Sequence, residues 1–343
     1  MQLLRRYRES GATLPFGDLL TAHGVAMEGY FWRFTQPETG RVVIALCGVN
    51  QASDGNWATL GLAAHPGGFV RTEAHPEGTA HPGRLGAIAG TAFSGGAERV
   101  RMDLGRDAQL DVRITPTLPW PRRRFGGSSV FQSVPALIQY WHPWLLGGRA
   151  EGRAVLGDEV WDLGGAQVYG EKNWGRGGFP DSWWWGQAQG FADSSACVAF
   201  AGGEIHTGPL RTTVTAVVVV LPDGRVVRLG NPVVSPIRAD VTDESWSLRG
   251  GNRWWHVEIE GYSPIGRAHV LPVPLPSERR NVAGSIEHLA GTLRVTVRER
   301  GAVVWEDESA LAALEHGGLE PAGAELRRRR SKSDATDAPP TLQ

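Results

Sequence analysis

Short apolar runs separated by turn residues recur along the chain and predict β-strands. The run RVVIALCGV covers 41–49 and follows the turn-like PETG. The run TTVTAVVVVL begins at 212, ends at Pro-Asp-Gly and resumes as RVVRLG. A turn of this kind between two β-rich runs predicts a hairpin over 212–230.

Strict alternation near the C-terminal end predicts a strand with one buried and one wet face. Leu293, Val295 and Val297 alternate with arginine and threonine, which is the period of two expected of such a strand. A turn at 300–301 precedes GAVVWEDES and predicts a second hairpin.

Helical periodicity is scarce. The best short helix candidates are LPFGDLLTAHG at 14–24 and SALAALEHGG at 309–318. The segment 115–145 is rich in proline and aromatic residues without alternation, which predicts a long connection. The chain from about 321 on lacks large apolar residues, which predicts a disordered tail.

The strand density, with 46 Gly and 22 Pro in 343 residues, favours an all-β fold with many turns and few short helices. Two antiparallel β-barrels or sandwiches account for the length, because closing a sheet removes its exposed edges. We expect an N-terminal extension (1–22), a first β domain (23–130), a connecting segment (131–145), a second β domain (146–318) and a disordered tail (319–343).

Charge and composition limit the partners. The formal net charge is −1, so no general attraction to nucleic acid is expected. The N-terminus lacks a secretory signal, and the longest apolar run, at 216–221, is too short to span a bilayer. We expect a cytoplasmic protein that is able to touch a membrane surface. Cys47 and Cys197 lie in apolar runs without histidines at metal-ligand spacing, which predicts buried free thiols and no metal site.

Two common catalytic motifs are missing from the sequence. There is no G-x-S-x-G nucleophile elbow and no glycine-rich nucleotide cradle. What remains is the stretch YGEKNWGRGGFPDSWWWGQAQGF at 169–191. In an extended strand Glu171 and Asn173 share one face, and Lys172 and Trp174 share the other.

The same alternation applies after the proline. Trp183, Trp185 and Gln187 share a face, and Trp184 takes the opposite one. Two adjacent strands then place a carboxyl, an amide and two or three indoles around one space. The alternative is an aromatic core with the acid paired to the neighbouring lysine or to an arginine.

Several segments resemble the tocopherol cyclase family. They are HGVAMEGYFWRF (23–34), SVFQSVPALIQYWHP (129–143), 146–191 and NVAGSIEHLAGTLRVTV (281–297). The most specific part is YGEKNWGRGGFPDSWWWGQ, in which Gly170 replaces an expected alanine and the loop at 176–178 is slightly longer. The resemblance implies two lipocalin-like barrels and a ring closure that turns a prenylated hydroquinone into a chromanol.

The implied chemistry explains the residue types. Protonating the trisubstituted alkene creates a tertiary cation, which the phenol oxygen captures. The acid must stay protonated near neutral pH, which needs a desolvated carboxyl. Indole faces stabilise the cation, and a closed apolar cavity excludes water. The reaction is redox-neutral, so we expect no cofactor.

Glu171 is our candidate for the acid, with Asp54 and Asp181 as rivals. Asn173 and Gln187 are candidates for holding the ring hydroxyls. The remaining candidates for substrate contact are aromatic: Trp174, Trp183 and Trp185 as cavity walls, with Tyr140, Trp141 and His142 closing one mouth.

Other functions fit parts of the same pattern. A lipocalin-like carrier of an apolar quinol or carotenoid also needs an enclosed aromatic cavity. A hydratase or cyclase acting on a polyprenyl alkene needs a buried acid as well. A sugar-binding protein places its tryptophans on an open face instead. We expect an apolar prenylated small molecule as the partner.

Overall fold

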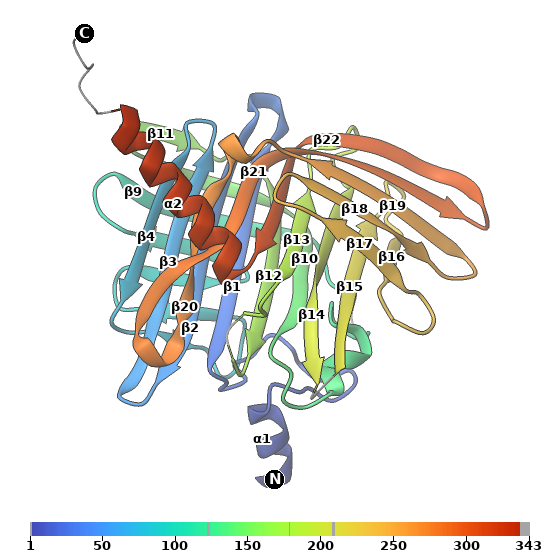
Figure 1. The fold of residues 1–343 in the computed structure, drawn as a ribbon, viewed down its shortest axis with the longest axis horizontal. Helices are drawn as coiled ribbons and strands as arrows, with labels where there is room; N and C mark the ends of the chain where they lie inside the picture. The colour runs from blue at the N-terminus through green and yellow to red at the C-terminus, as the bar shows by residue number, and fades with distance from the viewer. Residues whose placement is uncertain (1, 122–123, 178, 208–209, 337–343) are drawn as a thin grey trace.

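The computed structural model describes residues 2–121, 124–177, 179–207 and 210–336, and they form two large antiparallel sheets (Figure 1). The first sheet has the strand order β4-β3-β2-β1-β12-β10-β9-β8-β7-β6-β5, with β11 paired to β10. Its strands are β1 (Met27–Gln36), β2 (Arg41–Ala52), β3 (Gly55–His65), β4 (Phe69–His75), β5 (Thr79–Ala80), β6 (Gly86–Ala89), β7 (Phe93–Gly96), β8 (Arg99–Asp103), β9 (Ala108–Pro119), β10 (Tyr140–Leu156), β11 (Glu159–Asp162) and β12 (Gln167–Gly175).

The second sheet has the order β16-β15-β14-β13-β22-β21-β19-β18-β17, with β20 paired to β21. Its strands are β13 (Trp183–Ala188), β14 (Cys197–Thr207), β15 (Leu210–Val220), β16 (Val226–Leu229), β17 (Ile237–Val241), β18 (Ser245–Gly251), β19 (Trp255–Tyr262), β20 (His269–Leu275), β21 (Arg280–Glu299) and β22 (Ala302–Gly317).

Both sheets curl toward closure. β3 contacts β5 near the opposite edge of the first sheet, and β15 contacts β17 near the opposite edge of the second. The all-β prediction with two antiparallel units is therefore confirmed. The hairpin predicted over 212–230 is β15–β16, and the one around 300–301 is β21–β22.

Three predictions about helices and order were wrong. Residues 14–24 form no helix, and 309–317 lie in β22, where pairing with β13 and β21 overrides the local helical preference. Residues 319–336 of the predicted disordered tail form α2 (Leu319–Thr336), because this part packs on β21 and β20 and buries Ala322 (Figure 1), whereas 337–343 lie outside the described residues. The other α-helix of the described residues is α1 (Gln2–Glu9). Neither is long and apolar enough to cross a membrane.

The change of sheet comes after β12, within the stretch 169–191. β10, β11 and β12 follow the segment expected to connect two domains, yet they pair within the first sheet. The chain then passes through 176–182 to β13 in the second sheet. The stretch singled out in the sequence is therefore the crossover between the two sheets.

Buried apolar side chains form five clusters among the described residues. One lies inside each curled sheet, two lie between the sheets, and one lies between the N-terminal segment and the first sheet. β12 sends Val168 into the first sheet and Tyr169 between the sheets. β13 sends Trp184 into the second sheet and Trp185 between the sheets. All six residues of β13 are buried because both of its faces are covered. Strands buried on both faces read as continuous apolar runs, which explains the three consecutive tryptophans.

A buried ion pair ties the N-terminal segment to the first sheet. Lys172 Nζ lies 2.8 Å from Glu28 Oε2 and donates to the Thr21 carbonyl at 2.8 Å. Glu28 Oε1 accepts from the backbone N–H groups of His23 and Gly24. Lys172 is fully buried, so its charge depends on these partners. The alternative pairing of the lysine with the adjacent acid, Glu171, does not occur.

We expect Lys172→Met to lower the free energy of unfolding by about 3–5 kcal/mol, because it leaves the Glu28 carboxylate buried without its cation. Urea unfolding followed by tryptophan fluorescence measures the change. Arg99→Met is the control, since it breaks the exposed pair with Asp111 and should cost below about 1 kcal/mol. Equal losses in the two variants would contradict the stabilising role of the buried pair.

Candidate functional site

Two cavities meet between the sheets around Glu171. The first extends from the segment before β10 to β14 and β15, and the second extends between β1, β2 and β20. Five residues line both cavities: Glu171, Asn173, Phe179, Trp185 and Glu315. The site therefore lies between the two sheets, and its residues surround one space, as the alternation in the sequence predicts. The sheet faces that meet here are those of β12 and β13, the strands on either side of the crossover.

Three ring donors hold one oxygen of Glu171. The ring N–H groups of Trp141 and Trp185 donate to Oε2 at 2.7 and 2.8 Å, and the Tyr169 hydroxyl donates at 2.7 Å. These donors come from β10, β13 and β12, so both sheets fix the carboxyl. Among the described residues no hydrogen bond reaches Oε1. That oxygen is left for a ligand at the junction of the two cavities.

Burial and hydrogen bonding act on Glu171 in opposite directions. Its side chain is 6% exposed, and burial raises the pKa of the carboxyl. The hydrogen bonds from Tyr169, Trp141 and Trp185 lower the pKa, because they stabilise the charged form. Desolvation is the larger of the two effects on the pKa of Glu171, and the three hydrogen bonds reduce the increase that it causes.

Two further carboxyls, which the sequence analysis missed, lie on the facing sheet. Glu287 of β21 and Glu315 of β22 are direct cross-strand partners. Burial raises the pKa of Glu315 to about 7, opposed by the Ser285 hydroxyl and the Trp183 ring N–H. Burial and the neighbouring Glu315 raise the pKa of Glu287 well above its usual range. The local signal was a Glu-His pair inside an apolar strand, SIEHLAG in one case and ALEHG in the other.

Arg33 is a buried cation whose charge acts on this group. It is fully buried on β1 and donates to Gln187 Oε1 at 2.9 Å and to Thr35 Oγ1 at 2.7 Å. It also donates to the backbone carbonyls of Leu289 and Leu311. Its charge lowers the pKa of Glu287 without pairing directly with that carboxyl. Gln187, predicted to bind substrate, instead orients this guanidinium and lines neither cavity.

Asn173 reaches the cavities because its cross-strand partner is glycine. Gly29 pairs with Asn173, and a Cβ at Gly29 would lie 1.9 Å from Asn173 Oδ1. The carboxamide therefore occupies the space that any other residue at position 29 would need. Asn173 lines both cavities, as the sequence prediction requires.

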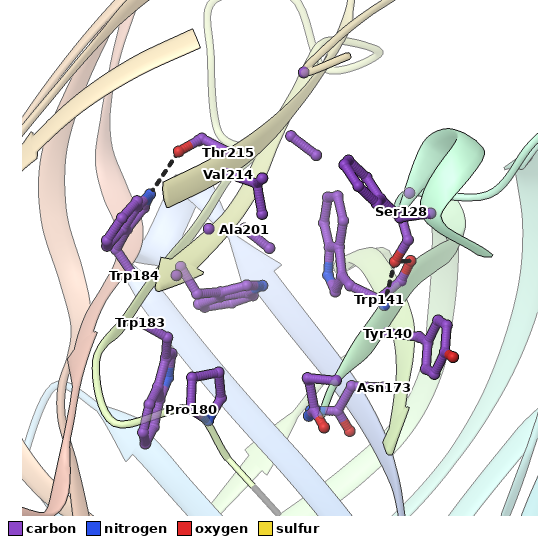
Figure 2. A pocket seen from close by; sticks show the side chains of 18 of the residues that line it. Ser128, Tyr140, Trp141, Asn173, Pro180, Trp183, Trp184, Ala201, Val214 and Thr215 are labelled. Carbon is purple, nitrogen blue, oxygen red and sulfur yellow. Dashed lines mark hydrogen bonds between the residues drawn. The ribbon is translucent and has the colours of Figure 1, made fainter. Parts of the chain in front are cut away.

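The tryptophans of β13 form a wall of the first cavity. Trp183 and Trp184 lie opposite Trp141 and Asn173 (Figure 2). The Trp184 ring N–H donates to Thr215 Oγ1 at 3.0 Å, whereas the Trp183 ring N–H acts on Glu315, whose pKa it lowers. Trp183 and Trp185 thus line the cavity as predicted, and both are buried. The open tryptophan face expected of a sugar-binding protein does not occur at β13.

Three other predicted contact residues pack mainly on the other face of the first sheet: Trp174, Tyr140 and His142. Trp174 stacks on Tyr140 and His23 and lines neither cavity, because strand alternation turns it away from Glu171. Tyr140 borders the first cavity, but its hydroxyl donates to the Val134 carbonyl at 2.6 Å. His142 packs edge-on against Trp120, and burial lowers its pKa to about 3. Trp141, between Tyr140 and His142, is the residue that contacts Glu171.

The rival acids lie elsewhere. Asp54 is in the exposed β2–β3 turn and pairs with Arg279 at 3.0 Å. Asp181 is exposed in the crossover, and neither aspartate lines the two cavities. In the described part of the chain, no group of three or more His, Cys, Asp or Glu side chains is arranged to hold a metal ion. Both cysteines are free and buried, as predicted.

Comparisons with known proteins give a family model and distant relatives. The family model described as tocopherol cyclase-like matches residues 78–318. The probable chloroplastic tocopherol cyclase of Oryza sativa subsp. japonica is 29% identical over 197 residues, which cover 54% of this chain and 41% of that protein. The matched part is thus well under half of the relative's own length.

Two solved structures are similar in fold. CghA with Sch210972 has a TM-score of 0.57 at 12% identity, covering 86% of this chain and 89% of that one. Kievitone hydratase from Nectria haematococca has a TM-score of 0.55 at 9% identity, with the same coverage of 86% and 89%. At these identities the likeness shows the shared fold alone.

We expect Tyr169→Phe to raise the pKa of Glu171, because the charged carboxyl loses one of its three donors. Titration of ¹³C-labelled glutamate carboxyls by NMR measures the change. Trp184→Phe is the matched control: it removes a ring N–H that donates to Thr215, so the Glu171 titration should stay as in the wild type. A Glu171 pKa that falls or stays constant in Tyr169→Phe would show that the hydroxyl does not stabilise the carboxylate.

Proposed function

Because this chain belongs to the tocopherol cyclase-like family, we propose that it is an enzyme that closes a prenylated hydroquinone to a chromanol by protonating the alkene. The observation that carries the proposal is the set of three donors fixing the buried Glu171 carboxyl where two cavities meet. A buried carboxyl of this kind can donate or accept a proton without competition from bulk water.

The surroundings of Glu171 suit a reaction through a carbocation. The walls near it are indole and phenyl rings, among them Trp183, Trp185 and Phe179. Such walls exclude the water that would otherwise capture the cation. Indole faces add about 0.5–2 kcal/mol each toward a nearby cation. The positive charge of such a cation would be balanced mainly by the nearby carboxylates.

The two cavities suggest how an extended substrate lies. A prenylated hydroquinone has a ring with two hydroxyls, an alkene next to it and an apolar chain. With the reacting alkene at the shared junction, the ring occupies one cavity and the chain the other. Asn173, which lines both cavities, is placed to bind a ring hydroxyl.

An apolar substrate is most readily taken from a membrane, and the first cavity has an apolar border. Val130, Val134 and Ile138 are exposed in the segment that contributes to its lining. α1 lies against this segment, because the Tyr7 hydroxyl donates to the Ser133 carbonyl at 2.7 Å. Its exposed Leu3, Leu4 and Arg6 extend the same surface. We propose that this surface contacts lipid transiently.

We expect the wild-type protein to convert a prenylated hydroquinone into an isomer of equal mass with one fewer phenol. Glu171→Gln should bind the same substrate but lose about 100-fold or more in kcat. Mass spectrometry, acetylation of free phenols and tryptophan quenching measure product and binding. Glu306→Gln, an exposed change on β22, is the matched control.

The product distinguishes the competing functions. A gain of one water in mass would indicate hydration of the alkene. Binding without any product would indicate a carrier. Full turnover in Glu171→Gln would exclude this carboxyl from the reaction.

We expect the protein to sediment with phosphatidylcholine vesicles and the double variant Val130→Glu/Val134→Glu to remain in solution, because charge replaces the apolar surface. Val160→Glu is the control, since it changes a valine on β11 that is more exposed than either Val130 or Val134. Sedimentation of the double variant at the wild-type level would contradict lipid contact through this segment.

A further inference from the structure

Glu287 and Glu315 form a carboxyl pair on one face of the second sheet. They are direct cross-strand partners on β21 and β22, and such partners have Cβ atoms about 4.5–5.5 Å apart. Two carboxylates at this separation repel each other in a desolvated space, so one of them retains a proton. The pair is therefore a proton store near neutral pH.

The pair faces the cavity without internal partners that neutralise it. Glu287 is 3% exposed, lines the second cavity, and its Oε1 is buried without a hydrogen bond. No ion pair within the described residues includes Glu171, Glu287 or Glu315. The hydrogen bonds of Arg33 go to neutral acceptors. A buried carboxyl oxygen without a hydrogen bond, on a residue that lines a cavity, requires an explanation, and a role in catalysis is one.

Glu171, across the junction, is also desolvated but differs in its hydrogen bonds. Its Oε2 accepts three hydrogen bonds, which favour the ionised form. Carboxyls whose environments separate their protonation in this way divide the acid and base roles of a reaction. The more protonated partner is the acid and the other is the base.

We propose that, if the reaction is the ring closure put forward above, the Glu287–Glu315 pair supplies the proton to the alkene and Glu171 accepts the proton of the phenol. Glu315 is the member that reaches the substrate, because it lines both cavities, as Glu171 does. Glu287 acts through Glu315 as a positioning residue. The assignment differs from the expectation, drawn from sequence alone, that Glu171 is the acid.

The atoms balance over one turnover. The O–H bond of Glu315 breaks, and its proton forms a C–H bond at the less substituted alkene carbon. The phenol oxygen then forms a C–O bond to the tertiary cation, and its proton passes to Glu171 Oε1. The product is an isomer of the substrate. Return of one proton from Glu171 to Glu315 across the junction restores the enzyme.

The pH dependence follows from the charges that face the pair. Arg33 approaches from β1 and Glu171 from β12, and Ser285 and Trp183 act on Glu315 from β21 and β13. Burial keeps the pKa of Glu315 at about 7, so the acid carries its proton below this pH and loses it above. We expect kcat of the wild type to fall as the pH rises through about 7.

The experiment compares Glu315→Gln and Glu171→Gln on a prenylated hydroquinone and on its ring-fluorinated analogue, whose phenol is more acidic. Both variants should lose about 100-fold or more in kcat on the parent compound. The loss in Glu171→Gln should shrink on the fluorinated compound, because an acidic phenol needs a base less. The loss in Glu315→Gln should stay the same. Glu306→Gln is again the matched control.

The possible results separate this assignment from the proposed function. If the loss shrinks on the fluorinated compound only in Glu315→Gln, or if Glu315→Gln keeps the wild-type rate, the assignment is wrong while the cyclase function stands. If the wild type forms no isomer from either compound, the proposed function itself fails. The wild-type pH profile does not depend on any variant folding, and a kcat that rises through pH 7 would also overturn the assignment.

Discussion

The arrangement of this protein depends on the cost of keeping three carboxyls in one desolvated space between two sheets. An isolated carboxylate loses most of its hydration there, and Glu171, Glu287 and Glu315 are coupled to one another. The fold limits this cost in two ways. Three ring donors stabilise charge on Glu171, and proximity holds a proton on the facing pair. Arg33 supplies positive charge without forming an ion pair with any of the three.

The two-sheet architecture is what makes this space available. Each sheet has its own apolar core, so the fold of each sheet does not depend on apolar packing at the face between them. The inter-sheet face can then carry polar groups where the packing opens into the two cavities. β12 and β13 lie at the crossover, so the residues that contact Glu171 come from strands next to it in the chain or paired to it. This explains why one short stretch of sequence contains much of the site.

Local patterns were sufficient for part of this arrangement. The period of two placed Glu171 and Asn173 on one face, and Lys172 and Trp174 on the other, as observed. It could not identify Glu287 and Glu315, since these residues become neighbours only when β21 pairs with β22. The local sequence of β22 around Glu315 moreover predicted a helix. The tail helix was missed for a related reason: Leu319–Thr336 has little apolar periodicity, and its packing on β21 is a tertiary contact.

The orientation of the indoles changes how a cation would be stabilised. Trp141 and Trp185 direct their ring N–H groups at Glu171, so their edges rather than their faces serve the carboxyl. A carboxylate about 4 Å from a cation contributes about 4 kcal/mol at an effective dielectric constant of about 20. One indole face contributes at most about 2 kcal/mol. In the proposed reaction Glu171 would therefore be the larger source of stabilisation, and these two tryptophans would act mainly by fixing its position and excluding water.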